Sequence, residues 1–250
     1  YSSEKDDSGE PKATPEYSKQ PKTITDDVIV IKYNDVKAMD KVLRQNCQDI
    51  ACVIIEPVVS NFGYLPANID FLTRLRGVTA ETGIILIFDE VQSFRLGPGG
   101  AQELLGVIPD MTCLGKIIGG GLPIGAFGGR KDIMNLFDPT QEVTPISHAG
   151  TFNANPVTMR AGEVVMNHLT QEVYDRMNSM GEVLRNKLGA TFDELGIPIQ
   201  VTGIGSLFGL HFTASEISNY DDVLSADLDK KAMFFLGMLN EGILMQTGIA

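Results

Sequence analysis

The chain has few of the residues that several classes of protein depend on. Its 250 residues include no tryptophan, three cysteines and three histidines. Cys47, Cys52 and Cys113 follow no zinc-ligand spacing and form no even set for disulfides, and the histidines are scattered, so we expect no metal site. Because Cys52 and Cys113 lie inside apolar runs, we expect both to be buried free thiols in a reducing compartment.

Basic charge and long apolar segments are also scarce. Lysine and arginine number 20 against 32 aspartates and glutamates, which gives a net charge of −12. This acidity disfavours nucleic acid and anionic membrane surfaces as partners. No apolar run approaches the roughly 20 residues that cross a bilayer. With 43% hydrophobic residues, the composition is typical of a soluble globular protein, expected in the cytoplasm or in a soluble organelle interior.

Apolar runs alternate with helical patterns along the first half of the chain. Residues 1–26 are almost entirely polar and are predicted to be mobile, because they cannot bury enough apolar surface to offset the entropy of ordering. After them, strands are predicted at residues 28–33, 50–59, 84–88 and 111–114, and helices from residue 36, after an Asn34-Asp35 cap, and at 69–82, closed by Gly83. This order predicts an α/β fold whose mostly parallel sheet has helices on both faces.

The second half is predicted to lead into a smaller unit. Pro156 suits the first turn of one long helix over residues 156–190. Strands at 197–201 and 206–212, a helix at 228–239 and a short strand-like stretch at 243–246 follow. We therefore divide the chain into a mobile polar segment (1–26), a large domain (27–155), a connecting helix (156–190) and part of a small α+β domain (191–250).

Two charged residues stand where predicted strands end. Ile-Leu-Ile-Phe leads into Asp89, and Cys-Leu-Gly leads into Lys116 and three glycines. Ligands of parallel sheets bind beyond the carboxyl ends of the strands, so Asp89, Lys116 and Glu56 are expected to converge on one crevice. The apolar neighbours of Lys116 predict a desolvated, nucleophilic amine. A lysine that forms a Schiff base and a carboxylate that keeps a ring nitrogen protonated suit the chemistry of pyridoxal phosphate (PLP).

Each of these residues also has a plainer interpretation. Asp89 is equally placed to cap a helix, and Lys116 to be an ordinary solvated side chain. Glu90 suits a cap or a salt bridge. The glycines at 119–121 suit a flexible turn, and they form no P-loop because no Gly-Lys-Ser/Thr follows them.

Further candidates lie on either side of this pair. Thr151 comes shortly before the helix predicted to start at Pro156, where backbone amides and a hydroxyl suit a phosphate, or alternatively a plain cap. His148 suits a general base or a hydrogen-bonded structural role. Arg95 and Arg130 suit carboxylate binding or surface ion pairs.

Together these segments resemble the class-III aminotransferase family of fold-type I PLP enzymes, most closely the glutamate-1-semialdehyde 2,1-aminomutase group and related aminotransferases. The resemblance covers about residues 28–245, in order and with compatible spacing. The matching segments are Ile54-Ile-Glu-Pro57, Asn61-Phe-Gly63, Phe88-Asp-Glu-Val91, Phe94-Arg95, Pro109-Asp110, Leu114 to Gly129, and Gly150-Thr151 with Asn155-Pro156.

The resemblance implies roles for five residues. Lys116 would hold the cofactor PLP covalently, and Asp89 would pair with its pyridine nitrogen. Val91 would pack on one face of the ring, and Asn61 would lie near the ring hydroxyl or on the substrate side. Thr151 would reach the phosphate of the neighbouring subunit's cofactor, which implies a homodimer. The implied reaction moves an amino group between an amine or amino acid and a carbonyl compound, with Lys116 transferring a proton.

Two segments depart from the aminomutase pattern. Residues 89–95 are one residue shorter than the Asp-Glu-Val-x-Thr-Gly-Phe-Arg form, and residues 147–156 replace Tyr-Gln-Ala-Gly-Thr-Leu-Ser-Gly-Asn-Pro. Both departures leave the specific substrate open. The family's upstream Ser/Gly/Thr-rich phosphate loop and stacking aromatic residue, and the last part of its small domain, are not in this sequence, so the chain is expected to be truncated at both ends. Whether such a fragment is active alone is left open.

Three alternative functions compete with this interpretation. A nucleotide-binding dehydrogenase would need Gly-x-Gly-x-x-Gly between its first strand and helix, whereas the glycine run here follows a lysine. A non-catalytic protein built on the PLP fold is the second alternative, and the presence of Asp89 and Lys116 argues against a decayed site. An aminotransferase of unrelated substrate is the third.

Overall fold

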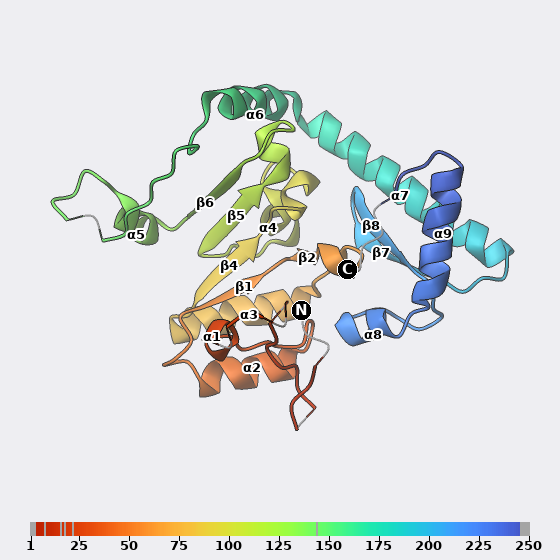
Figure 1. Cartoon of the computed structure of the whole chain (residues 1–250), viewed down its shortest axis with the longest axis horizontal. Helices are drawn as coiled ribbons and strands as arrows, with labels where there is room; N and C mark the ends of the chain where they lie inside the picture. Colours follow the sequence, from red (N-terminus) through yellow and green to blue (C-terminus); the bar gives the residue numbers. More distant parts are fainter. Residues whose placement is uncertain are drawn as a thin grey trace.

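A four-stranded sheet forms the centre of the computed structural model, which describes residues 4–7, 9–15, 17, 19–21, 23–143 and 145–245. Its strand order is β1-β4-β5-β6 (Figure 1). The strands β1 (Cys52–Ile55), β4 (Ile85–Asp89) and β5 (Met111–Gly115) are parallel, and β6 (Gly125–Gly129) runs antiparallel to β5. The predicted mostly parallel α/β sheet is confirmed.

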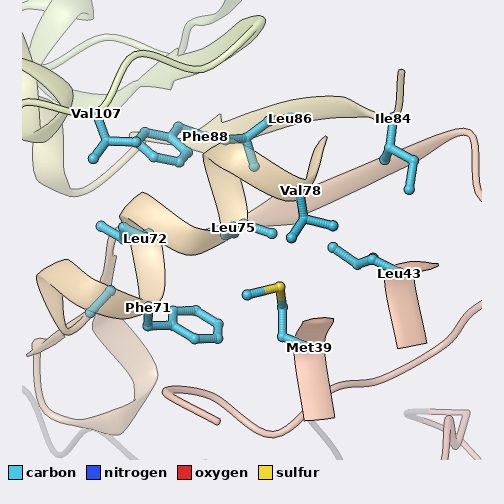
Figure 2. Packing of buried hydrophobic residues seen from close by; sticks show 11 residues of the cluster. Met39, Leu43, Phe71, Leu72, Leu75, Val78, Ile84, Leu86, Phe88 and Val107 are labelled. Atoms are coloured by element: carbon cyan, nitrogen blue, oxygen red, sulfur yellow. The ribbon is translucent and has the colours of Figure 1, made fainter. Parts of the chain in front are cut away.

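The main core lies between this sheet and two helices, α2 (Val36–Gln45) and α3 (Ile69–Thr82). Asp35 begins α2 by accepting a hydrogen bond from the amide of Ala38, and Gly83 ends α3 in the left-handed conformation, as predicted. Figure 2 shows side chains of both helices meeting those of β4 and its surroundings: Met39, Leu43, Phe71, Leu72, Leu75, Val78, Ile84, Leu86, Phe88 and Val107. Each large apolar side chain buried here contributes about 1.5–3 kcal/mol, so this cluster anchors the strands that carry the site.

Short elements connect the strands. After β1 come β2 (Val58–Val59), the 3-10 turn η1 (Ser60–Phe62) and β3 (Leu65–Pro66). After β4 come η2 (Ser93–Leu96) and α4 (Gly100–Leu105), and after β5 comes η3 (Lys116–Gly119). The short α5 (Lys131–Met134) and η4 (Asn135–Phe137) follow β6.

The second half forms a hairpin with helices beside it (Figure 1). From α6 (Pro156–His168), α7 (Gln171–Glu194) leads to the antiparallel pair β7 (Gln200–Ile204) and β8 (Leu207–His211). The helices α8 (Tyr220–Leu224) and α9 (Leu228–Asn240) follow. Edge-to-face contacts among Phe192, Phe212 and Phe234 hold α7 and α9 together with the end of β8.

The single helix expected over residues 156–190 is wrong. It is two helices, separated at Leu169 and Thr170, and the second extends to Glu194. Leu169 leaves the helical region with ψ 67°, and Thr170 takes the extended conformation of an N-cap. Apolar residues recur at helical spacing on both sides of this break, and so the pattern concealed it.

The strand expected at residues 28–33 is also wrong. Val28 and Ile29 are about half exposed, while Ile31 and Tyr33 pack against the main core. The Tyr33 hydroxyl donates to the carbonyls of Glu56 and Pro57, at 3.0 and 3.3 Å. The segment is therefore held by side chains, and within the described residues it pairs with no strand.

The expected burial of Cys52 is wrong as well. Alternate residues of a strand face opposite sides of the sheet, and Val53 and Ile55 take the side of the core. Cys52 and Ile54 face the other way and are exposed, whereas Cys113 is half-buried. Burial and the charge of Asp89 raise the pKa of the Cys113 thiol.

The remaining expectations concern the ends of the chain, membrane spans and metal sites. The described part of residues 1–26 contains α1 (Thr23–Asp26) and an ion pair from Lys5 to Asp221 at 3.1 Å; its mobility remains a prediction. Residues 243–245 form no strand, and Gln246 lies outside the described residues. Across the described ranges, no helix is long and apolar enough to cross a membrane, and no cluster of three or more metal-ligating side chains occurs.

Candidate active site

The carboxyl ends of three parallel strands meet at one edge of the sheet. Ile55 of β1 lies beside Phe88 of β4, and Asp89 lies beside Cys113 of β5. Neighbouring strands are about 4.8 Å apart. Glu56, Asp89 and Lys116 each end or directly follow one of these strands, so the sequence placed all three at the correct edge.

Asp89 is half-buried at the end of β4. Its Oδ1 accepts a hydrogen bond of 3.1 Å from the amide of Val91, which closes a local Asx turn. Its second oxygen has no hydrogen-bond partner among the described residues. Asp89 is therefore not a helix cap, because the N-cap of the following η2 is Gln92, and its second oxygen is open to a ligand.

Val91 lies beside Gly115, the last residue of β5. A Cβ built on Gly115 would lie 3.4 and 3.5 Å from the two methyl groups of Val91, so that side chain covers the residue just before the lysine. Lys116 itself has φ 47°, in the left-handed region that side chains other than glycine rarely adopt. Such backbone strain concentrates at functional sites.

The desolvated setting expected for the Lys116 amine is wrong for this chain. Lys116 is exposed, whereas its apolar neighbours Leu114, Ile117 and Ile118 are half-buried. In the part of the chain that the structure describes, its Nζ forms neither a hydrogen bond nor an ion pair.

Of the three glycines that follow Lys116, Gly119 and Gly120 are packed closely, whereas a Cβ on Gly121 would meet nothing within 4 Å. A Cβ on Gly120 would lie 2.4 Å from the carbonyl oxygen of Ala161, and one on Gly162 would lie 2.3 Å from that of Ile118. The lysine turn η3 thus rests backbone to backbone on α6. Only glycine allows this approach, which fixes the position of η3.

Glu90 is fully buried and serves as a cap. Its carboxylate accepts hydrogen bonds from the amides of Ala101 and Gln102, at 2.5 and 3.1 Å, and from the Ser93 hydroxyl at 3.1 Å. The Gln102 side-chain amide also donates to it, at 3.0 Å. Glu90 therefore holds the start of α4 beneath the Asp89 turn, in a structural role.

Asn61 lies at the exposed tip of η1. Below it, Glu56 accepts hydrogen bonds from the Ser60 amide (3.1 Å) and hydroxyl (2.8 Å). The turn closes at Gly63, with φ 80°, whose carbonyl accepts a hydrogen bond from Thr202 Oγ1. Asn61 is thus presented by a turn that β1 and the β7–β8 hairpin hold from two sides.

Thr151 and His148 lie in the segment before α6, and both are exposed. Thr151 is not the cap of that helix: Asn155 caps it, accepting from the amides of Val157 and Thr158. Within the described residues Thr151 has no recorded contact with Asp89 or Lys116, so its role remains a prediction. The ring of His148 packs edge-on against Phe127 and Phe137, which favours its structural interpretation.

The two arginines differ. Arg130 forms ion pairs with Asp132 at 2.6 Å and Asp110 at 3.0 Å, as its plainer interpretation predicts. Arg95 instead has a buried Nε with no hydrogen-bond partner among the described residues. The surface ion pair expected for Arg95 is therefore wrong.

Asp110 is a structural residue that the sequence analysis did not assign, although it stands in a matching Pro-Asp pair. Its carboxylate accepts from the Leu86 amide (2.8 Å), Arg76 (2.9 Å) and Arg130 (3.0 Å). Burial acts to raise the pKa of Asp110, but these hydrogen bonds and charges outweigh it and lower that pKa.

A shallow apolar groove of about 660 Å³ lies along α6. Of the predicted site residues, none lines it; its walls are Gly120, Pro156, Val157, Arg160, Ala161, Val164 and Val165. The strand ends, and not this groove, hold the charged groups that suit catalysis.

Comparison with known proteins identifies relatives across nearly the whole chain. The profile of the class-III aminotransferases matches residues 7–248. Glutamate-1-semialdehyde 2,1-aminomutase of Salinibacter ruber is 40% identical over 223 residues, 88% of this chain and 50% of the relative. The enzyme of the same name from Desulfotalea psychrophila is 42% identical over 227 residues, 90% of this chain and 52% of the relative.

Solved structures give the same picture. An omega-transaminase from Sphaerobacter thermophilus superimposes with a TM-score of 0.93 at 40% identity, over 97% of this chain and 56% of that one. A glutamate-1-semialdehyde aminomutase variant from Pseudomonas aeruginosa, in complex with PMP, gives 0.84 at 26% identity, over 98% and 56%. The chain spans about half the length of the relatives it matches.

Proposed function

The chain belongs to the class-III aminotransferase family, and from that premise we propose that the protein transfers amino groups between an amine or amino acid and a carbonyl compound, with PLP as cofactor. One observation carries the proposal. Asp89 and Lys116 follow neighbouring strands at one sheet edge, and the described residues leave the Lys116 amine and one Asp89 oxygen without partners.

The residues at this edge fit PLP. The cofactor presents an aldehyde, a pyridine nitrogen and a flat apolar ring, and the edge offers an amine, a carboxylate oxygen and the methyl groups of Val91. Gly115, which lies against Val91, has no side chain to obstruct the approach of the ring.

When bound, PLP supplies an aldehyde and a ring that withdraws electrons from the reacting carbon. The chemistry of the chain follows from its own groups. Lys116 would hold the cofactor through its Nζ and would move a proton at the reacting carbon. Asp89 would hold the ring nitrogen through its carboxylate and favour the protonated form of that nitrogen. Val91 would exclude water from one face of the ring, and Asn61 would orient the ring hydroxyl or the substrate.

For the substrate, we propose an aminomutase-like reaction, in which donor and acceptor belong to one molecule. The identities of 40–42% to aminomutases support it. Transfer between two molecules is the second candidate, favoured by the likeness to the omega-transaminase and by the departures at residues 89–95 and 147–156. We further propose a homodimer in which Thr151 reaches the phosphate of the other subunit's cofactor, in a soluble compartment.

Site-specific labelling of the full-length protein tests the cofactor assignment. Incubation with PLP followed by borohydride reduction is expected to leave a pyridoxyl group on the peptide containing Lys116. Lys116→Ala should abolish this label, while Lys131→Ala, which removes another exposed lysine, should retain it. Label spread over surface lysines, and persisting in Lys116→Ala, would remove the proposal.

Asp89→Asn separates the two interpretations of the aspartate. Asparagine keeps an Oδ1 that accepts from the Val91 amide, so the turn is preserved while the negative charge is lost. We expect cofactor to remain partly bound and turnover to fall by at least about a hundredfold, as when an electrostatic partner is removed from a transition state. Near-normal turnover would show that Asp89 only closes the local turn to Val91.

A further inference from the structure

Phe62 and Gly63, the two residues after Asn61, contact residues that lie far along the chain. On one side, the Phe62 ring stacks on Tyr220 of α8, with centroids 4.8 Å apart, inside a small cluster of Val59, Phe62, Leu65, Ile217 and Val223. On the other side, Gly63 lies against β8: a Cβ on Gly209 would be 2.4 Å from the Gly63 Cα, and one on Gly63 would be 2.6 Å from His211 Nε2. Among the described residues, Asn61 itself forms no hydrogen bond with either element.

A hydrogen-bond chain ends on the carbonyl of Gly63. Thr202 Oγ1 lies 2.5 Å from this carbonyl and 2.9 Å from His211 Nε2. A carbonyl oxygen only accepts, so the threonine proton points toward Gly63. The Thr202 oxygen must then accept from the histidine, which assigns the proton of His211 to Nε2.

The surroundings of His211 favour the neutral ring with its proton on Nε2. His211 is 1% exposed, and its Nδ1 is buried without a hydrogen-bond partner among the described residues. Burial, and then the charge of Lys231 on α9, lower the pKa of His211 to about 4. At neutral pH the ring is therefore uncharged, and it donates only to Thr202.

We propose that His211 is a positioning residue for the active site: through Thr202 it fixes Gly63, and thereby the turn that presents Asn61. This rests on the proposed function, in which Asn61 orients the ring hydroxyl or the substrate. Thr202 and His211, in the C-terminal half of the chain, would thus set the position of Asn61, which lies in the N-terminal half.

The test compares His211→Phe, His211→Gln and Thr202→Val in the full-length protein. Phenylalanine fills the ring space without a donor, whereas the glutamine amide nitrogen reaches the place of Nε2 and restores one. Thr202→Val removes the hydroxyl at nearly constant volume, and it stands in if His211→Phe does not fold. His168→Phe, at an exposed histidine of α6, is the control.

The first measurement is hydrogen exchange of the peptide over residues 58–66, without cofactor. Loss of one buried hydrogen bond is expected to speed exchange at Gly63 and Tyr64 about tenfold in His211→Phe and Thr202→Val. His211→Gln should lie close to the wild type, and His168→Phe should match it. Unchanged exchange in both His211→Phe and Thr202→Val would overturn the proposal that His211 fixes Gly63 through Thr202, whatever the activity of the protein.

The second measurement is a double-mutant cycle on kcat/KM with Asn61→Ala. We expect His211→Phe to lower kcat/KM about tenfold when Asn61 is present and to add no further loss in Asn61→Ala. Equal losses in both backgrounds would mean general destabilisation and would overturn the proposal. Full activity of Asn61→Ala would refute the role of Asn61, and positioning with it, while leaving the assignment of Lys116 and Asp89 to its own labelling test.

Discussion

A single methyl group at Gly162 should separate α6 from the lysine turn. Gly162 is a buried helical glycine whose Cβ would lie 2.3 Å from the carbonyl oxygen of Ile118, whereas ordinary contacts begin at 3.4 Å. Gly162→Ala therefore requires the two backbones to move apart by about 1 Å. The same change at Gly189 of α7 meets nothing within 4 Å, which makes it the matched control.

At Gly162, helix propensity and overpacking change the free energy of unfolding in opposite directions, whereas at Gly189 only helix propensity acts. Replacing glycine by alanine inside a helix stabilises by about 1 kcal/mol, and overpacking costs about 1–3 kcal/mol. We expect Gly189→Ala to raise the free energy of unfolding by about 1 kcal/mol, and Gly162→Ala to lower it by up to about 2 kcal/mol.

The assays are urea denaturation and steady-state kinetics of the full-length protein. A displacement of about 1 Å beside the reacting lysine is expected to reduce kcat/KM about a hundredfold in Gly162→Ala, with little change in Gly189→Ala. If Gly162→Ala were as stable and as active as Gly189→Ala, the close packing of α6 on η3 would not constrain the site, and this reasoning would be refuted.

Two further substitutions test the buried carboxylates. Because the pKa of Asp110 is lowered in the folded protein, its ionised carboxylate contributes stability above the ordinary pKa of 3.8, and this stability is lost as pH falls through the lower folded pKa. Asp110→Asn should lower the free energy of unfolding by about 3 kcal/mol at pH 7 and flatten its pH dependence below pH 4 in urea titrations. Parallel curves of unfolding free energy against pH for the two proteins would contradict this. Glu90→Gln places an amide donor against the backbone amides of Ala101 or Gln102. We therefore expect the free energy of unfolding to fall by about 2–3 kcal/mol in thermal or urea denaturation, with little change in Lys116 labelling. An unchanged free energy of unfolding would show that Glu90 is not the cap of α4.

Local signals in the sequence predicted much of the sheet and its charged edge. The helix over 69–82 was predicted at its full length because Gly83 marks its end, and Asp89 and Lys116 were placed because each terminates an apolar run. The break at Leu169 and Thr170 was missed because the apolar pattern continues through it. The strand β6, Gly125–Gly129, contains three glycines and carries almost no strand signal of its own.

Contacts between distant segments were beyond the reach of these patterns. The role of the glycines at 119–121 depends on Gly162 and Ala161, and the support of Asn61 depends on Thr202 and His211. No periodicity relates such residues, because each contact is decided by how α6 and the β7–β8 hairpin pack on the rest of the chain. Exposure was misjudged for the same reason at Cys52, whose side of the sheet depends on the register of β1 with β4.

The hydrogen bond between Thr202 and Gly63 joins residues 139 positions apart, which has a consequence for biosynthesis. At about 5–20 residues per second, a ribosome needs about 7–28 s to add the 139 residues that follow Gly63 and end with Thr202. The strand β1 is already made when that interval begins, and β4 and β5 are added during it, while the turn bearing Asn61 still lacks its hydrogen bond to Thr202. Translation speed through residues 64–202 thus decides how long this unfinished edge is open to chaperones and proteases.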